Sequence, residues 1–267
     1  MEVKNFDLLG LMEFDKATFG RQNYKLGYGL AIDRRETGIV FESKDFDLFM
    51  FDSSNNSISD FWGVEYRVQD DMSVYYVQNH INTNVNRTYM GLTYNTKLDE
   101  ETKLNLEYSI YDWDATPSID DGTAYILDFH GKDWNFKYIV EEDGFVSRFD
   151  SSLLADDTSL MSPLYRHFRF VGNVNDMFLK YTMKQGEADL HIVYEAMEQE
   201  TGNNEISVIT LGYEKEVKKG VNFGLSYSMI SPDNTDSNRG GMNDMTVIAP
   251  NANEDATIIK MQMRVKF

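Results

Sequence analysis

Several features that mark other classes of protein are missing from this 267-residue chain. There is no Cys, which excludes disulfide frameworks, zinc-thiolate clusters and cysteine nucleophiles, and which fits an oxidising compartment without proving one. No stretch approaches the ~18 to 20 consecutive apolar residues of a transmembrane helix. The first residues, MEVKNFD, lack the basic start and apolar run of a signal peptide, so we expect a mature chain or one that is not exported.

Basic residues are scarce relative to acidic ones. The 25 Lys and Arg against 44 Asp and Glu give a formal charge of -19, which disfavours nucleic acid as a partner because phosphate binding needs a basic surface. The four His are scattered singly, and the serine-elbow, zinc-protease, phosphate-loop and calcium-loop motifs are missing from the sequence. We therefore expect no enzyme activity, no cofactor and no metal site.

Period-two alternation of apolar and polar residues dominates the sequence. The last eleven residues, TIIKMQMRVKF, show it clearly, because apolar side chains fall on one side of a strand and polar ones on the other. A strand that crosses a bilayer at the usual tilt needs about 9 to 11 residues, so this segment is long enough to do so. A single strand of this kind also occurs in the sheets of soluble proteins.

The same alternation predicts about fourteen strands, an even number, as single-chain bacterial outer-membrane barrels require. The predicted strands are Phe6–Asn23, Gly38–Ser43, Phe46–Asp52, Asp60–Gln69, Met72–His80, Arg87–Lys97, Thr102–Trp113, Thr123–His130, Trp134–Val140, Asp176–Lys184, Ala188–Glu198, Glu205–Glu216, Val221–Ile230 and Thr257–Phe267.

Short and long connections alternate between these strands. The short ones are three to five residues such as SKD and HGKD, whereas the long ones include residues 22–37, 80–86, 141–175, 198–205 and 231–256. This asymmetry is typical of outer-membrane barrels, which have tight periplasmic turns and long extracellular loops. The predicted second face is charged, whereas a soluble barrel fills its interior with apolar side chains. We therefore predict one all-β domain over residues 1–267: a transmembrane, antiparallel, up-and-down β-barrel of about 14 strands, complete or part of a larger barrel.

Two stretches resemble the alginate-export porin family. The first, TFGRQNYKLGYGLAIDRRETGIVFE, carries a Gly-Arg-Gln motif, later glycines and a basic pair at Gly20, Arg21, Gln22, Gly27, Gly29, Arg34, Arg35 and Gly38. The second, SPLYRHFRFVGNVNDMFLKY, resembles the family's PLY...H.F.G..D segment at Pro163, Leu164, Tyr165, His167, Phe168, Gly172 and Asp176. The resemblance covers about residues 14–267 and implies an outer-membrane channel for anionic saccharides or other small solutes. Family members usually have more strands before the Gly-Arg-Gln motif.

The candidate site residues are basic side chains that a barrel would direct into its lumen. Arg21 precedes a long loop; it either steers carboxylate solutes or pairs with a lumenal acid such as Glu42 or Glu65. We place Arg34 and Arg35 in the loop itself. In the 141–175 connection, Arg166, His167 and Arg169 form a basic constriction if the loop folds inward, or part of an external lid if it does not. The other lumen candidates are Arg67, Lys103, Lys137, Lys180, Lys260, Arg264 and Lys266.

We expect a porin in the bacterial outer membrane that passes small anionic or saccharide solutes by diffusion or export. Its expected partners are outer-membrane lipid and lipopolysaccharide, and the barrel-assembly machinery through the terminal Phe267; a homotrimer is compatible with the sequence. Two alternatives stay open at this point. The first is a structural or adhesive barrel with a plugged lumen, and the second is a soluble β-rich binding protein.

Overall fold

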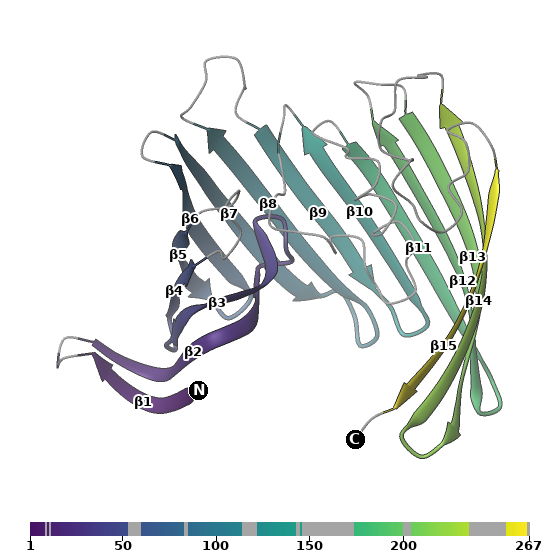
Figure 1. Cartoon of the computed structure of the whole chain (residues 1–267), viewed down its shortest axis with the longest axis horizontal. Coiled ribbons are helices and arrows are strands. Elements are labelled where there is room, and N and C mark those ends of the chain that lie inside the picture. The colour runs from purple at the N-terminus through teal and green to yellow at the C-terminus, as the bar shows by residue number, and fades with distance from the viewer. Residues whose placement is uncertain are drawn as a thin grey trace. The chain divides into compact units, whose positions relative to one another are not determined.

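The computed structural model describes residues 1–8, 10, 12–52, 60–82, 85–113, 122–142, 145, 174–199, 204–234 and 255–265. Strands account for almost all of these residues, and they lie in one sheet in chain order (Figure 1). The strands are β1 (Glu2–Leu8), β2 (Met12–Leu26), β3 (Ile32–Glu42), β4 (Phe46–Asp52), β5 (Phe61–Gln69), β6 (Met72–Asn82), β7 (Val85–Lys97), β8 (Lys103–Trp113), β9 (Gly122–His130), β10 (Trp134–Glu142), β11 (Val174–Gln185), β12 (Ala188–Gln199), β13 (Asn204–Lys218), β14 (Val221–Asn234) and β15 (Ala256–Val265). In this part of the chain, no helix is long and apolar enough to cross a membrane.

The prediction of an antiparallel all-β fold with consecutive strands paired is confirmed, but the number of strands differs. The segment predicted as one strand, Phe6–Asn23, is two strands, β1 and β2, with Phe6 directly opposite Phe14. Gly10 has φ 71° in the turn between them, a conformation that glycine adopts without steric cost. The described residues therefore form fifteen strands rather than fourteen.

Several predicted long connections are shorter than expected because the strands continue further. Residues 22–37 were expected to be a loop, yet β2 runs to Leu26 and β3 begins at Ile32. Arg34 and Arg35 consequently lie in β3, opposite Tyr24 and Asn23, and the prediction that this pair sits in a loop is wrong. Likewise only residues 83–84 separate β6 from β7, and only residues 200–203 separate β12 from β13.

The chain divides into two compact units. The first contains Met1–Thr96, Asn105–Ile126 and Glu141–Leu153, and the second contains Lys97–Leu104, Leu127–Val140 and Leu154–Phe267. The turn from β7 to β8 is a polar one: the N–H groups of Glu101 and Thr102 donate to Asp99 Oδ1 at 2.8 and 2.7 Å. These two hydrogen bonds hold the pKa of Asp99 below its ordinary value.

In the second unit the pairing of β11 to β15 separates apolar from polar side chains. Residues directly opposite one another share a face of a sheet, and Tyr181, Ile192, Leu211, Tyr227 and Ile259 form one such row. All five are exposed or nearly so. The neighbouring row, on the other face, consists of Thr182, His191, Gly212, Ser226 and Lys260.

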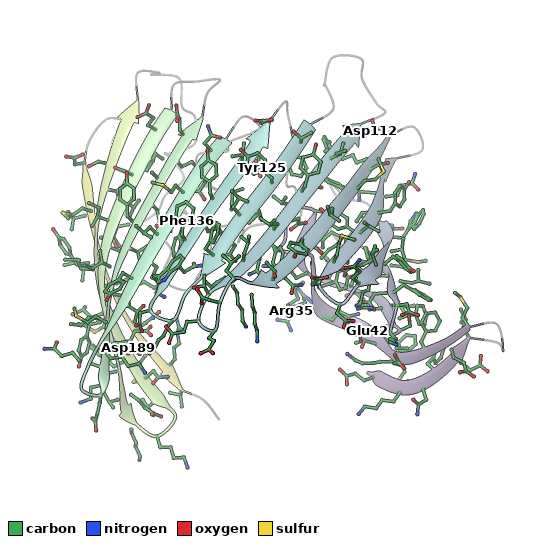
Figure 2. All side chains as sticks on the ribbon, turned by 180° about the vertical axis from the view of Figure 1, so that it is seen from behind. Arg35, Glu42, Asp112, Tyr125, Phe136 and Asp189 are labelled. Atoms are coloured by element: carbon green, nitrogen blue, oxygen red, sulfur yellow. The ribbon has the colours of Figure 1, made fainter. Side chains whose placement is uncertain are left out.

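The first unit shows the same separation across β3 to β6. Ile39, Met50 and Trp62 form a row on one face, and Glu42, Asp47, Glu65 and Tyr75 form a row on the other. Met50 and Trp62 are exposed, whereas Asp47 and Tyr75 are buried. Side chains project from both faces of the strands in Figure 2, where Glu42 is labelled. Each unit therefore exposes an apolar face and keeps its polar side chains, many of them buried or half-buried, on the other face, the reverse of a water-soluble protein.

Candidate functional site: the polar faces

The polar face of the first unit is held by a band of ion pairs and hydrogen bonds near the short turns. Lys16 Nζ lies 2.6 Å from Glu42 Oε2, and Arg67 Nη2 lies 2.6 Å from Asp47 Oδ2. Arg67 also donates through Nη1 to the carbonyl oxygen of Ser43 at 2.9 Å. These contacts cross-link β2 to β3 and β4 to β5, so the charges are paired across neighbouring strands rather than buried alone.

The band continues through hydroxyl groups to the next strands. Ser73 Oγ donates to Glu65 Oε1 at 2.6 Å and shares a second hydrogen bond of 2.6 Å with Thr93 Oγ1. Two positions further along β6, on the same face, Tyr75 Oη donates to Glu107 Oε1 at 2.7 Å. Polar side-chain contacts thus follow one another across this face of the first unit from β2 to β8.

The β2–β3 hairpin lies over this network. Its tip, Gly27–Ala31, which we call the hairpin tip, contacts Glu107 on β8 through backbone N–H groups. Leu26, Leu30, Ala31 and Ile32 are fully buried, and the tip lies against β8 in Figure 1. A segment that the sequence predicted as an external loop therefore packs against the polar face.

Aromatic side chains fill another part of the same face. Tyr89 and Tyr111 pack with ring centroids 5.0 Å apart, and Phe145 lies 6.0 Å from each of them. All three are fully buried. Tyr89 is directly opposite Val77, two positions along β6 from Tyr75, so this cluster belongs to the polar face. Phe145 is the described residue of the connection that follows β10, and it packs inward.

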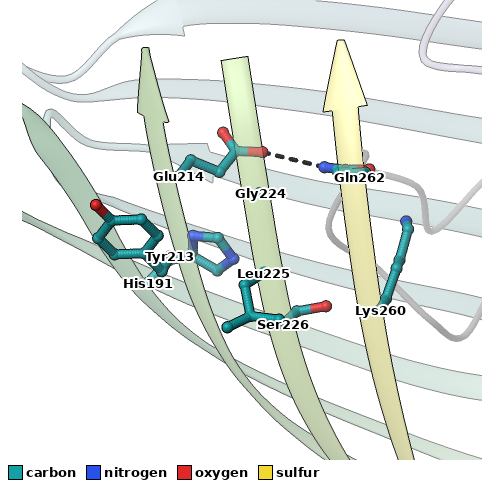
Figure 3. A pocket seen from close by; sticks show the side chains of 8 residues that line it. All are labelled: His191, Tyr213, Glu214, Gly224, Leu225, Ser226, Lys260 and Gln262. Carbon is teal, nitrogen blue, oxygen red and sulfur yellow. Dashed lines mark hydrogen bonds between the residues drawn. The ribbon is translucent and has the colours of Figure 1, made fainter. Parts of the chain in front are cut away.

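The polar face of the second unit also buries charged side chains: Asp176 is 3% exposed and Glu195 is 1% exposed. Thr210 and Ser228 share a hydrogen bond of 2.7 Å, and Gln262 Nε2 donates to Glu214 Oε1 at 3.3 Å (Figure 3). The ring of His191 lies over Gly212, where a Cβ atom would stand 1.7 Å from Nε2. Glycine at this position is therefore what allows the imidazole to lie flat across β13.

A second polar cluster of this unit lies at the turn between β9 and β10. His130 Nε2 and Asp128 Oδ2 are 2.7 Å apart, and Asn135 Nδ2 donates to Asp128 Oδ1 at 2.9 Å. Lys137 attracts the same carboxylate electrostatically. The three side chains fix the turn to the following strand. Across the described part of the chain, His, Asp and Glu side chains do not gather into a group that could hold a metal ion.

The predicted lumen residues are distributed over both polar faces. Arg67 belongs to the first unit and pairs with Asp47. In the second unit, Lys260 lies opposite Ser226, Arg264 opposite Asn222 and Lys180 opposite Val193. Lys137 lies in β10 and Lys103 begins β8. Arg166, His167, Arg169 and Lys266 lie outside the described residues, as does Phe267.

Arg21 is the exception among the described candidates. It lies opposite Thr37, and Gly38, the residue after Thr37, lies directly opposite Phe51, whose ring is on the polar face. Side chains alternate along a strand, so Arg21 projects from the opposite face. The predicted partners of Arg21 contact other residues instead: Glu42 pairs with Lys16, and Glu65 accepts from Ser73. The register thus places Arg21 on the face away from Phe51, and a role for Arg21 in the lumen stays a prediction.

The contact between Glu107 and the hairpin tip was not predicted from the sequence. Glu107 and Tyr28 are 79 positions apart, and an alternating strand with one acid gives no sign of what that acid will contact. The available signal was the Gly27-Tyr28-Gly29 run, which marks an unusual backbone conformation without saying where the loop folds.

Comparison with solved structures gives the fold of outer-membrane porins of the Occ family. OccK5 (OpdH) of Pseudomonas aeruginosa matches with a TM-score of 0.56 at 11% identity, covering 94% of this chain and 78% of that one. OccAB2 of Acinetobacter baumannii matches with a TM-score of 0.56 at 12% identity, covering 93% and 73%. OccD3 (OpdP) of P. aeruginosa matches with a TM-score of 0.53 at 11% identity, covering 93% and 74%. No protein-family model and no curated protein matches the sequence, so the resemblance to alginate-export porins stays a prediction.

Proposed function

We propose that this protein is a channel in a bacterial outer membrane through which small anionic or saccharide solutes pass passively. The observation that carries the proposal is the inverted distribution of side chains in each unit: charged and hydroxyl groups share one face, and exposed Met, Leu, Ile, Trp and Tyr share the other. An apolar face of this kind is favourable against the hydrocarbon of a lipid bilayer, whereas exposing it to water costs free energy. The soluble binding protein, the second alternative from the sequence, is disfavoured by the same observation.

The fold shared with Occ porins supports this proposal, since those proteins are outer-membrane channels. The proposed arrangement is one barrel domain over residues 1–267, alone or within a larger barrel. Its polar faces line the lumen, its apolar faces meet lipid and lipopolysaccharide, and its short turns lie in the periplasm. We further propose that Phe267 is recognised by the barrel-assembly machinery; a homotrimer is one arrangement that these features allow.

A narrowed lumen is part of the proposal. Two segments support it: the hairpin tip packs against Glu107, and Phe145 packs against Tyr89 and Tyr111. Phe145 opens the connection that carries Arg166, His167 and Arg169, and its inward packing favours the constriction over an external lid. The finer resemblance to alginate-export porins fits the same picture, because it too implies passage of anionic saccharides.

The plugged, adhesive barrel remains the competing function, and the tight burial of Tyr89, Tyr111 and Phe145 is the observation that favours it. A plug and a constriction differ in whether ions pass. The two hypotheses are therefore separated by conductance rather than by fold.

The proposed filter for anions consists of the basic residues on the polar faces: Arg67, Lys103, Lys137, Lys180, Lys260 and Arg264. We expect the double variant Lys260→Gln, Arg264→Gln to shift the reversal potential in a potassium chloride gradient toward cation selectivity by on the order of 5 to 10 mV. The reason is that removing two lumenal positive charges lowers the local concentration of anions. The measurement is the zero-current potential across a planar bilayer.

The matched control is Met261→Gln, because Met261 lies between the two basic residues in sequence but projects from the apolar face opposite Leu225. This control should leave the reversal potential unchanged. An unchanged potential in the double variant as well would remove Lys260 and Arg264 from the filter.

A further inference from the structure

The hairpin tip has a backbone conformation that only its glycines allow easily. Gly27 has φ 56° and Gly29 has φ 107°, and Gly29 N donates to the carbonyl oxygen of Leu26 at 3.0 Å. This tight turn directs the N–H groups of Tyr28 and Leu30 toward the same point on β8. Two backbone N–H groups that converge in this way, here from alternate residues, form a concave site for an anion.

The anion in that site is the carboxylate of Glu107. Its Oε2 atom accepts hydrogen bonds from Tyr28 N at 2.7 Å and Leu30 N at 3.4 Å, while Oε1 accepts one from Tyr75 Oη at 2.7 Å. Glu107 is only 2% exposed, and Lys25 attracts it electrostatically. One side chain of the wall thus satisfies two backbone donors of the tip, which burial would otherwise leave without partners.

The fit around the carboxylate is close. A Cβ atom on Gly27 would lie 2.7 Å from Thr93 Cγ2 and 2.9 Å from Glu107 Cδ. On the other side of the turn, Tyr28 Oη donates to Asn105 Oδ1 at 3.2 Å. The tip is therefore seated against β7 and β8 by shape and by polar contacts, and Glu107 is the residue that contacts its backbone directly.

We propose that Glu107 is a positioning residue of the channel: it holds the hairpin tip against the polar face by filling the tip's own anion-binding concavity, and so sets the width of the lumen there. This inference rests on the proposed channel function. The Glu107→Ala variant removes the carboxylate and the Cγ atom and so empties the concavity. Acetate has the same heavy atoms as the removed group, and we expect it to bind in the emptied concavity.

The first test is single-channel recording of Glu107→Ala in planar bilayers. We expect a conductance about twofold larger than that of the unsubstituted protein, with larger fluctuations, because the tip loses its anchor. Replacing chloride by acetate should return the ratio of variant to unsubstituted conductance toward one. Glu107→Gln should stay close to the unsubstituted protein, because an amide oxygen still accepts from both N–H groups. Glu65→Ala is the control, since Glu65 is a carboxylate of the same face that accepts from Ser73 and not from the tip.

The second test does not depend on conductance. Native-state hydrogen exchange should show the amides of Tyr28 and Leu30 exchanging about tenfold faster in Glu107→Ala, while the amides of β6 keep their protection. Tyr75→Phe removes a single hydrogen bond to Glu107 with little change of shape and should accelerate the same two amides by a smaller factor, which provides the test if the alanine variant does not assemble.

The outcomes separate the two levels of the proposal. Unchanged protection of Tyr28 and Leu30 in both variants would overturn the role of Glu107, whatever the channel does. Faster exchange with no acetate effect on the Glu107→Ala conductance would overturn the anion site. If the protein shows no conductance but the amides of Tyr28 and Leu30 still exchange faster in Glu107→Ala, the proposed channel function is wrong. The role of Glu107 in holding the hairpin tip would then still stand.

Discussion

Leu211→Arg is expected to destabilise the folded protein in lipid bilayers by about 2–4 kcal/mol, the cost of an arginine on the lipid face of a barrel near the bilayer midplane. Leu211 is the eighth of the fifteen residues of β13 and is 47% exposed. It lies in the row of Ile192 and Tyr227, so its surroundings are apolar. The measurement is reversible denaturant unfolding in lipid vesicles.

Val217→Arg is the matched control. Val217 is 58% exposed and lies near the end of the same strand, next to the turn into β14. At that depth the same substitution should cost about 0–1 kcal/mol, because the guanidinium reaches the interface. If Leu211→Arg were also within ~0.5 kcal/mol of the unsubstituted protein, as is usual for an exposed position in water, the apolar face would not be a lipid face.

Phe51→Ala is expected to cost about 3–5 kcal/mol, the usual range for removing a buried aromatic ring. Phe51 is 1% exposed and packs on the polar face against Phe61 and Tyr24, with ring centroids 5.1 and 5.2 Å away. Gly38 makes room for its ring. The alanine variant would leave a cavity between β3, β4 and β5, and the same unfolding experiment in lipid measures its cost.

Met50→Ala, one residue away, provides the comparison. Met50 is 62% exposed on the apolar face, so lipid fills the space that the truncated side chain leaves. We expect a loss below about 1 kcal/mol, because the surrounding hydrocarbon replaces most of the lost contacts. Equal losses at both positions would mean that the two faces do not differ in their environment.

Alternation along the chain was enough to predict most of the fold. Phe46–Asp52 was predicted with its observed bounds, and most of the later strands lie within a few residues of the prediction. The turn at Gly10 was missed because Gly10 is a single turn-forming residue between two leucines in the sequence. The β2–β3 hairpin was predicted as a long loop because its glycines and its Arg34-Arg35 pair are typical of loops, yet cross-strand pairing overrides that preference.

For the candidate site, the sequence predicted the face on which several basic side chains lie, but not their distant contacts. Period two placed Lys180, Lys260 and Arg264 on the face with His191 and Ser226, and the register agrees. The face of Arg21 was not predicted, because the loop expected after residue 21 hid the pairing that fixes that face. The role of Glu107 depends on contacts between β2, β6 and β8, and local pattern carries no information about such distant partners.

The most direct test of the account is reconstitution of the purified protein into planar lipid bilayers. A channel with a polar lumen narrowed by the hairpin tip predicts discrete conductance steps, with a reversal potential that favours anions in a salt gradient. A protein that inserts into the bilayer and shows no conductance steps would contradict the channel and support the plugged barrel.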